Sequence, residues 1–350
     1  MFKLSKGDKV AIVSLSSGVL GQSSCSHQLE LGAKRIRSFG LEPVYMKNAL
    51  KGIEYIKSNP KARAEDLIQA FKDKTINAVF CAIGGIDTYR IAPYIFDNPE
   101  AISTIKNNPK LFMGYSDTTI NHFMLRKLGI NTIYGLSYLP DFSELGEEML
   151  PYTKSAFEQL FREEPFRFGP SDTWYEERTD FSAKALNTPR IAHKETRGYE
   201  LLQGKPQFKG HLLGGCIDSI YELLTGYRFE DEKTINDKYQ LFPATEDFNG
   251  AILFLETSEE KPSPEYIENT LNILIARGVL DVINGVIIGK PQDEIMYDEY
   301  KEVYKRVLKT YPISVVYNMN FGHAHPKMIM PYGTMAYIDT DKQEIIMERP

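Results

Sequence analysis

Residues 111–129, with the sequence LFMGYSDTTINHFMLRKLG, place an apolar run, a small polar corner and an amphipathic segment in direct succession. The apolar residues Leu111–Met113 indicate the end of a buried strand. The spacing of apolar residues over Thr118–Leu128 predicts a helix that ends at Gly129. Ser116 stands at the corner between the two. A strand that turns directly into a helix is typical of α/β proteins with a parallel sheet.

The same alternation of strand and helix extends through the first 135 residues. Further short strands are predicted at Lys9–Ser14, Pro43–Tyr45, Ala78–Ile83 and Asn131–Tyr134. Helices are predicted at Gln28–Phe39, Ala62–Lys72 and Tyr89–Phe96. We therefore expect an α/β fold whose N-terminal part is a doubly wound, mostly parallel sheet of flavodoxin or Rossmann type. Such sheets bind ligands beyond the carboxyl ends of their strands, where Gly84, Gly85 and Ser116 stand.

A second α/β pattern fills the later part of the chain. It comprises a glycine-led helix at Gly214–Leu224, strands at Ala251–Leu255, Val282–Ile288 and Ile313–Tyr317, helices at Pro264–Arg277 and Tyr297–Leu308, and strands after Lys327. Residues 141–207 show no clear periodicity, which is typical of a linker or a functional segment. We therefore predict an N-terminal α/β domain at 1–140, a linker and substrate-covering segment at 141–207, and a smaller C-terminal α/β domain at 208–350.

The composition is that of an ordinary globular protein, with 42% hydrophobic and 25% charged residues among 350. The net charge of −6 does not favour a nucleic-acid polymer, because such partners usually require a basic face. No apolar run approaches the roughly 20 residues that span a membrane, and the first residues do not resemble a signal peptide. Cys25, Cys81 and Cys216 are too scattered for a disulfide framework or a thiolate zinc site. We expect a cytoplasmic protein without a cofactor.

Ser116 has two interpretations. A nucleophile at this turn would be held above the sheet, and the amides and dipole of the following helix could stabilise an oxyanion. The alternative is that Ser116 or Asp117 merely caps the helix, which is the commoner use of such residues. The nucleophile motif of α/β-hydrolases, Gly-x-Ser-x-Gly, is absent, because Thr118 stands two residues after the serine. The local sequence leaves both interpretations open.

Gly84 and Gly85 also stand between a predicted strand and a predicted helix. Glycines allow the backbone to approach a ligand closely and offer free N–H groups. The pair lacks the third glycine of a dinucleotide-binding fingerprint. It is therefore either a tight turn or a second oxyanion donor opposite Ser116.

A serine nucleophile needs a base and a group that orients the base. Among the six histidines, His323 follows a predicted strand and a glycine, a position from which it could reach across a cleft. Glu256 directly follows the apolar strand Ala251–Leu255, where a carboxylate is costly unless it has a partner, although exposed strand ends are also common. His323 and His325 could instead suggest a metal, but no acidic or thiol residue completes a close ligand set there.

Taken together, these residues resemble a known group of enzymes. Ser116 in GYSDTT, Glu256 in LFLET and His323 in NFGHAHP are similar to motifs of the serine-peptidase family of LD-carboxypeptidases and microcin C self-immunity peptidases. The resemblance covers nearly the whole chain, including VAIVSLSSG at 10–18 and HLLGG at 211–215.

Three positions depart from the family pattern. Cys216 stands where the family usually has asparagine, Leu136 where proline is frequent, and His325 where threonine is common. None of these changes affects Ser116, Glu256 or His323. The changes leave undecided which residues contact the substrate.

The resemblance implies an active site in the cleft between the two domains, without a metal, in a chain that forms a homodimer. His323 would take the proton from Ser116 and return it to the leaving amine. Glu256 would hold the imidazole in the correct tautomer and stabilise its charged form. The backbone N–H groups of Gly85 and Asp117 would bind the oxyanion.

Two branches of the family differ in their substrates. Murein LD-carboxypeptidases release a terminal D-alanine from wall peptides, whereas self-immunity peptidases cut the amide between an aminoacyl or peptidyl group and a modified nucleotide. The length of the chain and the loop Ser137–Phe142 resemble the second branch. We therefore expect a peptidyl-nucleotide substrate, with a small wall peptide as the alternative.

Four residues are candidates for substrate contacts. Trp174 could stack on a nucleobase, or it could simply pack the linker down. Lys290 could meet a carboxylate or phosphate, or it could be solvated. Gly84 and His325 are further candidates from their places beside the predicted catalytic residues. A non-catalytic binding protein with two α/β lobes is an alternative of a different class.

Overall fold

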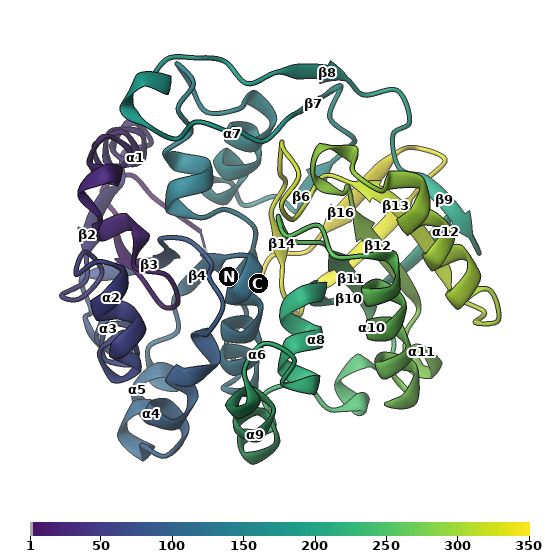
Figure 1. Ribbon diagram of the computed structural model, residues 1–350, viewed down its shortest axis with the longest axis horizontal. Helices are drawn as coiled ribbons and strands as arrows, with labels where there is room; N and C mark the ends of the chain where they lie inside the picture. The colour runs from purple at the N-terminus through teal and green to yellow at the C-terminus, as the bar shows by residue number, and fades with distance from the viewer. Residues whose placement is uncertain (1–2) are drawn as a thin grey trace.

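The computed structural model describes residues 3–350, so Met1 and Phe2, at the start of the predicted domain 1–140, lie outside the described residues. Two large sheets lie side by side, each accompanied by helices (Figure 1). Each sheet with its helices is called a half of the molecule, and the chain passes from the first half to the second near the middle of its length. Among residues 3–350 no helix combines the length and the apolar character needed to cross a membrane. The predicted α/β fold with two sheets is confirmed.

The first sheet has six strands in the order β14-β5-β4-β3-β1-β2. Its strands are β1 (Lys9–Val13), β2 (Glu42–Tyr45), β3 (Ile76–Cys81), β4 (Leu111–Gly114), β5 (Ile133–Tyr134) and β14 (Met330–Pro331). All neighbouring pairs are parallel except β14 with β5. Because β1, β3 and β4 point the same way, their carboxyl ends share one edge of the sheet, where Ser16, Gly84 and Ser116 follow.

The helices of this half connect the parallel strands. They are α1 (Ser26–Ser38), α2 (Ile53–Ser58), α3 (Pro60–Lys72), α4 (Ala92–Phe96), α5 (Pro99–Asn107) and α6 (Thr119–Lys127). The sequence pattern did not predict α2 and α5, which are short. The start of α5 nevertheless carries a clear signal, because the Asn98 side chain accepts hydrogen bonds from the N–H groups of Glu100 and Ala101.

The second sheet has eight strands in the order β6-β16-β15-β10-β11-β12-β13-β9. These are β6 (Phe166–Phe168), β9 (Glu200–Gln203), β10 (Gln207–Cys216), β11 (Ile252–Glu256), β12 (Gly285–Gly289), β13 (Ser314–Met319), β15 (Met335–Asp339) and β16 (Glu344–Met347). The central strands β10 to β13 are parallel, and the outer pairs are antiparallel. The helices are α8 (Ile217–Thr225), α9 (Glu230–Tyr239), α10 (Pro264–Ala276), α11 (Val279–Val282) and α12 (Tyr297–Leu308).

Two predicted elements in this half are wrong. The predicted glycine-led helix at Gly214–Leu224 is a strand as far as Cys216, and the helix α8 begins only at Ile217. The glycines serve close packing of strands, since a Cβ on Gly214 would lie 1.8 Å from the carbonyl oxygen of Phe254 on β11. The strand predicted to begin at Val282 begins at Gly285, because the preceding residues form α11.

Residues 141–207 supply the two edge strands of the second sheet rather than forming a bare linker. The helix α7 (Pro151–Glu158) is followed by β6, which pairs with β16 at one edge of the second sheet, while β9 pairs with β13 at the other. A separate two-stranded sheet joins β7 (Thr173–Tyr175) to β8 (Ala192–Lys194). Near the end of the chain, β14 returns to the first sheet and pairs with β5. Neither large sheet is therefore built from one continuous stretch of chain.

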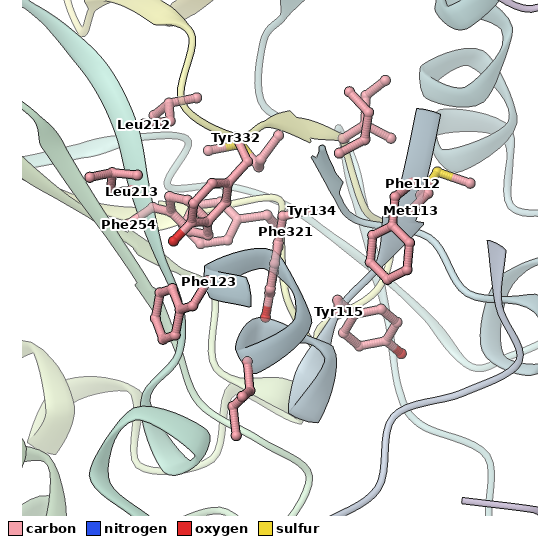
Figure 2. Packing of buried hydrophobic residues seen from close by; sticks show 14 of the residues in the cluster. Phe112, Met113, Tyr115, Phe123, Tyr134, Leu212, Leu213, Phe254, Phe321 and Tyr332 are labelled. Atoms are coloured by element: carbon pink, nitrogen blue, oxygen red, sulfur yellow. The ribbon is translucent and has the colours of Figure 1, made fainter. Parts of the chain in front are cut away.

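The hydrophobic core is continuous between the two sheets. The Tyr134 ring of β5 packs edge-on against Phe254 of β11, with 5.2 Å between ring centroids. Tyr332, just after β14, packs against the same Phe254 at 5.6 Å. Figure 2 shows these rings gathered with Phe123 and Phe321 at the junction of the halves. Large buried aromatic side chains of this kind hold two layers in a defined relative position.

Replacing Gly214 by alanine should prevent or severely weaken folding. The added Cβ would collide with the backbone of β11, and the φ angle of +147° is unfavourable for any residue with a side chain. We expect a loss of at least about 3 kcal/mol in the free energy of unfolding, measured by urea denaturation. Gly129→Ala is the matched control, since φ is +80° but no atom lies within 4 Å, and it should cost about 1 kcal/mol. Equal stability of the two variants would contradict this account.

Candidate active site

The corner between β4 and α6 holds Ser116 in a strained conformation. Its φ angle is +66°, in the left-handed region that residues with side chains rarely adopt. The turn is fixed on both sides, because the Ser116 N–H donates to the Tyr134 hydroxyl at 3.3 Å and the Ser116 carbonyl accepts from Thr119 Oγ1 at 2.7 Å. Strain of this kind persists where the surroundings enforce it, and it is concentrated at functional sites.

Asp117 anchors this turn to two other strand ends. Its carboxylate accepts a hydrogen bond from Ser16 Oγ, beyond β1, at 2.5 Å and from the Thr88 N–H, beyond β3, at 2.9 Å. Burial raises the pKa of Asp117 to about 6, against the opposing effect of these hydrogen bonds. The Asp117 side chain thus connects the loops that follow three neighbouring strands. This role goes beyond capping the helix that follows Ser116.

Gly84 lies directly against Ser116. A Cβ at Gly84 would stand 2.9 Å from Ser116 Oγ and 3.3 Å from the backbone nitrogen of Asp117. Gly85 has a φ angle of +152°, and a Cβ there would meet Ser16 Oγ at 2.2 Å. Glycine at position 84 therefore allows the backbone after β3 to approach Ser116, and glycine at position 85 avoids a collision with Ser16.

Glu256 ends β11 and is completely buried. One carboxylate oxygen, Oε1, accepts a hydrogen bond from the Tyr134 hydroxyl at 2.5 Å, and the other, Oε2, accepts from the His323 backbone N–H at 3.2 Å. The loop after β13 reaches this carboxylate because residue 322 is glycine: a Cβ on Gly322 would lie 2.5 Å from Oε2. The cost of burying this carboxylate is therefore met by several hydrogen bonds.

His323 connects the carboxylate to the serine. Its Nδ1 lies 2.7 Å from Glu256 Oε2, and its Nε2 lies 3.1 Å from Ser116 Oγ. A carboxylate can only accept a hydrogen bond, so Nδ1 carries a proton and Nε2 faces the hydroxyl. The Tyr115 ring packs edge-on against the imidazole at 5.0 Å between centroids and limits its rotation. This geometry allows proton transfer from the serine hydroxyl to the imidazole.

A second carboxylate also meets His323. Glu259 Oε2 lies 3.0 Å from Nε2, the same nitrogen that faces Ser116. Burial would lower the pKa of His323, but the charges and hydrogen bonds of Glu256 and Glu259 outweigh burial and raise the pKa to about 10. The hydrogen bond from His323 in turn lowers the pKa of Glu259 to about 2.

Ser116 and His323 open into a cavity of about 530 Å³. Apolar side chains form much of its wall: Val19, Ile83, Leu139, Pro140 and Phe181. The charged groups at its wall are Glu177, Arg190 and Glu259, and the first two form an ion pair of 2.8 Å. A mostly apolar cavity with a few convergent polar groups is typical of a small-molecule site.

A larger hollow of about 1080 Å³ lies elsewhere on the second half. Five basic side chains line it, namely Lys205, Lys209, Lys305, Arg306 and Lys309. Among the described residues that line this hollow there is no histidine or cysteine, so volume alone does not identify the reactive site.

Three predicted substrate contacts do not line the cavity beside Ser116 and His323, which is called the reactive cavity below. Trp174 stacks on His193 with 4.2 Å between ring centroids. Lys290 is buried and forms ion pairs with Glu195 at 2.9 Å and with Glu294 at 2.5 Å. Neither Trp174 nor Lys290 lines the cavity that contains Ser116.

His325, the third of these, is also buried and lies two residues beyond His323. Its Nε2 lies 3.1 Å from Glu177 Oε2, so it supports a residue of the cavity wall. Burial and the neighbouring charge of Lys327 lower the pKa of His325 to about 4. The imidazole is therefore neutral at pH 7. The predicted contact Gly84, in contrast, lines the cavity next to Ser116.

One set of side chains could offer ligands to a metal. Cys216, Glu256 and His323 place one ligand atom each within 4.8 Å of one another. However, Glu256 and His323 already bind each other, and burial together with the charges of Glu256 and Asp218 raises the pKa of the Cys216 thiol well above its usual value. A thiol that resists ionisation is a poor metal ligand, so the hydrogen-bonded arrangement accounts for these residues better.

Several residues of the site were missed by sequence reasoning. Tyr134 carried a possible signal, because a tyrosine ends a strand next to the strand that precedes Ser116. Glu177, Arg190 and Glu259 carried none, since they stand in segments without periodicity or among other charged residues. Only their positions in space show that they share a cavity with Ser116.

Known proteins match the chain along nearly all of its length. A model of LD-carboxypeptidase N-terminal domains matches residues 10–135, and a model of the C-terminal domains matches residues 209–338. The crystal structure of an MccF-like protein from Streptococcus pneumoniae, in complex with AMP, is 47% identical, has a TM-score of 0.94 and covers 97% of this chain and 98% of its own.

Two curated relatives are more distant. The "Probable murein peptide carboxypeptidase" of Bacillus subtilis is 27% identical over 99% of this chain and 93% of its own length. The microcin C7 self-immunity protein MccF of Escherichia coli is 24% identical over 98% of this chain and 93% of its own length. The predicted family and enzyme class are thereby confirmed. The chain belongs to the LD-carboxypeptidase family and is a hydrolase of the serine-peptidase type.

Proposed function

We propose that Ser116, His323 and Glu256 are the catalytic triad of an amide hydrolase. The observation that carries this proposal is the unbroken chain of contacts from Ser116 Oγ through both imidazole nitrogens to the buried carboxylate, at 3.1 and 2.7 Å. The membership of a peptidase family supports the same assignment. It also weighs against the alternative of a non-catalytic binding protein with two lobes.

The proposed reaction begins when His323 Nε2 removes the proton of Ser116 and the serine oxygen attacks the scissile carbonyl. The Glu256 carboxylate stabilises the imidazolium that forms, and the imidazolium then gives its proton to the leaving nitrogen as the C–N bond breaks. Water, activated by the same imidazole, hydrolyses the acyl-serine ester and restores the hydroxyl. No other co-reactant is needed for this balance.

The N–H groups of Gly85 and Asp117 are proposed to bind the oxyanion of the tetrahedral intermediate. Asp117 follows the nucleophile directly, and the close approach of Gly84 to Ser116 Oγ brings the backbone after β3 to the same point. Two donors fixed before the reaction stabilise negative charge without reorganisation.

We further propose that the scissile amide joins an aminoacyl or peptidyl group to a nucleotide-like leaving group. The support is the MccF-like relative from Streptococcus pneumoniae, which is 47% identical and was solved with AMP. The cavity of about 530 Å³ has the size range of small-molecule sites. Release of D-alanine from wall peptides is the second candidate, which the similarity to the Bacillus subtilis carboxypeptidase favours. We also propose that the chain forms a homodimer, as the resemblance to the family implies.

The Ser116→Ala variant decides the first part of the proposal. Loss of the hydroxyl should lower kcat by at least about 10³-fold, because no other group can form the acyl intermediate. Wild type and variant are incubated with aspartyl sulfamoyl adenosine and with a wall tetrapeptide ending in D-alanine, and products are read by mass spectrometry. Serine-dependent release of aspartate supports the nucleotide substrate, and release of D-alanine alone supports the second candidate. Turnover that survives in the variant would contradict the assignment of Ser116.

Glu256→Gln tests the orienting carboxylate. A glutamine amide can fill the same space, but it no longer stabilises the imidazolium or enforces the proton on Nδ1. We expect kcat to fall by about 10³- to 10⁴-fold while circular dichroism and the unfolding midpoint show a folded protein. A fall of less than about 10-fold would show that His323 does not depend on this carboxylate.

A nucleobase in this cavity would need an aromatic partner. Phe181 lines the cavity with an exposed ring, whereas one face of Trp174 is already covered by His193. Phe181→Ala should therefore raise KM for aspartyl sulfamoyl adenosine by about 5- to 100-fold, the range expected for one lost stacking contact. Trp174→Ala is the comparison variant. A larger effect at Trp174 would restore the stacking role first predicted for it.

A further inference from the structure

Two oxygen atoms compete for one nitrogen at the proposed base. Ser116 Oγ lies 3.1 Å and Glu259 Oε2 lies 3.0 Å from His323 Nε2. An imidazole nitrogen carries either a proton or a lone pair. If Nε2 donates a proton to Glu259, it has no lone pair with which to take the proton of Ser116. Hydrogen-bond geometry directs Nε2 at Ser116 Oγ, but the ion pair with Glu259 favours the protonated imidazole, which cannot take the proton of Ser116.

Glu259 is free to exchange its partner. Its side chain is 62% exposed and lines the reactive cavity. Within residues 3–350, His323 is the only basic side chain that has a nitrogen within 4.0 Å of its carboxylate. The other carboxylate of the cavity wall, Glu177, is instead held by Arg190 and His325. A cation that enters the cavity thus finds Glu259 as the carboxylate with the fewest competing contacts.

We propose that Glu259 binds an ammonium group on the carbon next to the scissile carbonyl of the substrate, and that this exchange releases His323 Nε2 to act as the base. The scissile carbon must lie about 3 Å from Ser116 Oγ for attack, and an ammonium on the adjacent carbon is only two bonds away from it. Glu259 Oε2 lies 3.0 Å from the same Nε2 that faces Ser116 Oγ at 3.1 Å. This inference rests on the proposed function and narrows its substrate to aminoacyl groups with a free amine.

The charges around His323 determine how kcat/KM depends on pH, and Glu259 is one of them. The groups that face it are Glu256 of β11, Glu259 of the following loop, Tyr115 of the β4–α6 turn, Cys216 of β10 and Asp218 of α8. Glu256 and Glu259 raise the pKa of His323 to about 10, so the free enzyme holds an imidazolium at neutral pH. An imidazolium cannot act as a base, so kcat/KM rises with pH through this pKa. Removing the charge of Glu259 moves that rise to lower pH.

The selectivity test compares alanyl sulfamoyl adenosine with its N-acetyl derivative. Wild type should prefer the free amine by about 10-fold or more in kcat/KM, the effect of one charge-assisted hydrogen bond. In Glu259→Gln the preference should fall below about 3-fold, and the rise of kcat/KM with pH for the N-acetyl compound should begin about 1 to 3 pH units lower. Glu260→Gln is the control, because Glu260 pairs with Arg228 and does not line the cavity. An unchanged preference and pH profile in Glu259→Gln overturns the proposal.

A second measurement does not depend on turnover, so it separates this inference from the proposed function. The imidazole of His323 is titrated by NMR, with its resonance assigned by its loss in His323→Asn. We expect a lower pKa in Glu259→Gln, and in wild type after addition of L-alaninamide, which carries the same ammonium beside a carbonyl. If alanyl sulfamoyl adenosine is not cleaved but these shifts occur, the proposed substrate is wrong and the role of Glu259 stands. If His323 titrates alike in all samples, the role of Glu259 is wrong.

Discussion

The hydrogen bond between Tyr134 and Glu256 is the constraint on which the rest of the site depends. Tyr134 belongs to the first sheet and Glu256 to the second, and the hydroxyl also accepts a hydrogen bond from the Ser116 N–H. One phenol thus sets the distance between the turn that carries the serine and the carboxylate that holds the histidine. The ring itself is fixed by packing against Phe254. Because the site spans two sheets, the distances within it depend on how firmly these aromatic rings hold the sheets in place.

The sequence predicted the ends of the first sheet's parallel strands and of β11 and β12 well, because a continuous apolar run followed by glycine or a small polar residue is typical of a buried strand that ends in a turn. It placed Ser116, Glu256 and His323 at such ends, and the resemblance to a family, rather than periodicity, joined them into one site. Two of the features that escaped this reasoning show why. The glycines of Gly214–Gly215 indicated a helix start locally, although the need for close strand packing decides their role. Glu259 could not be distinguished from its acidic neighbours, since its importance lies in one contact across space.

Strain and burial cost are concentrated on the turn that carries Ser116. The left-handed backbone at Ser116 and the buried carboxylate of Asp117 would each be unfavourable alone. Here they support each other, since the hydrogen bonds from Ser16 and Thr88 to Asp117 fix the turn that the φ angle requires. The free energy that offsets these two costs comes from the packing of the surrounding core rather than from the turn itself.

The return of β14 to the first sheet, after the chain has built most of the second, has a consequence for synthesis. Folding during translation proceeds from the N-terminus, so the parallel strands around Ser116 emerge from the ribosome first. His323 and the strand β14 follow more than 200 residues later in the sequence. In a nascent chain, Ser116 therefore lacks its contact with His323, and the edge of β5 is unpaired. The contacts that join Ser116, His323 and Glu256 can therefore form only after nearly the whole polypeptide has left the ribosome.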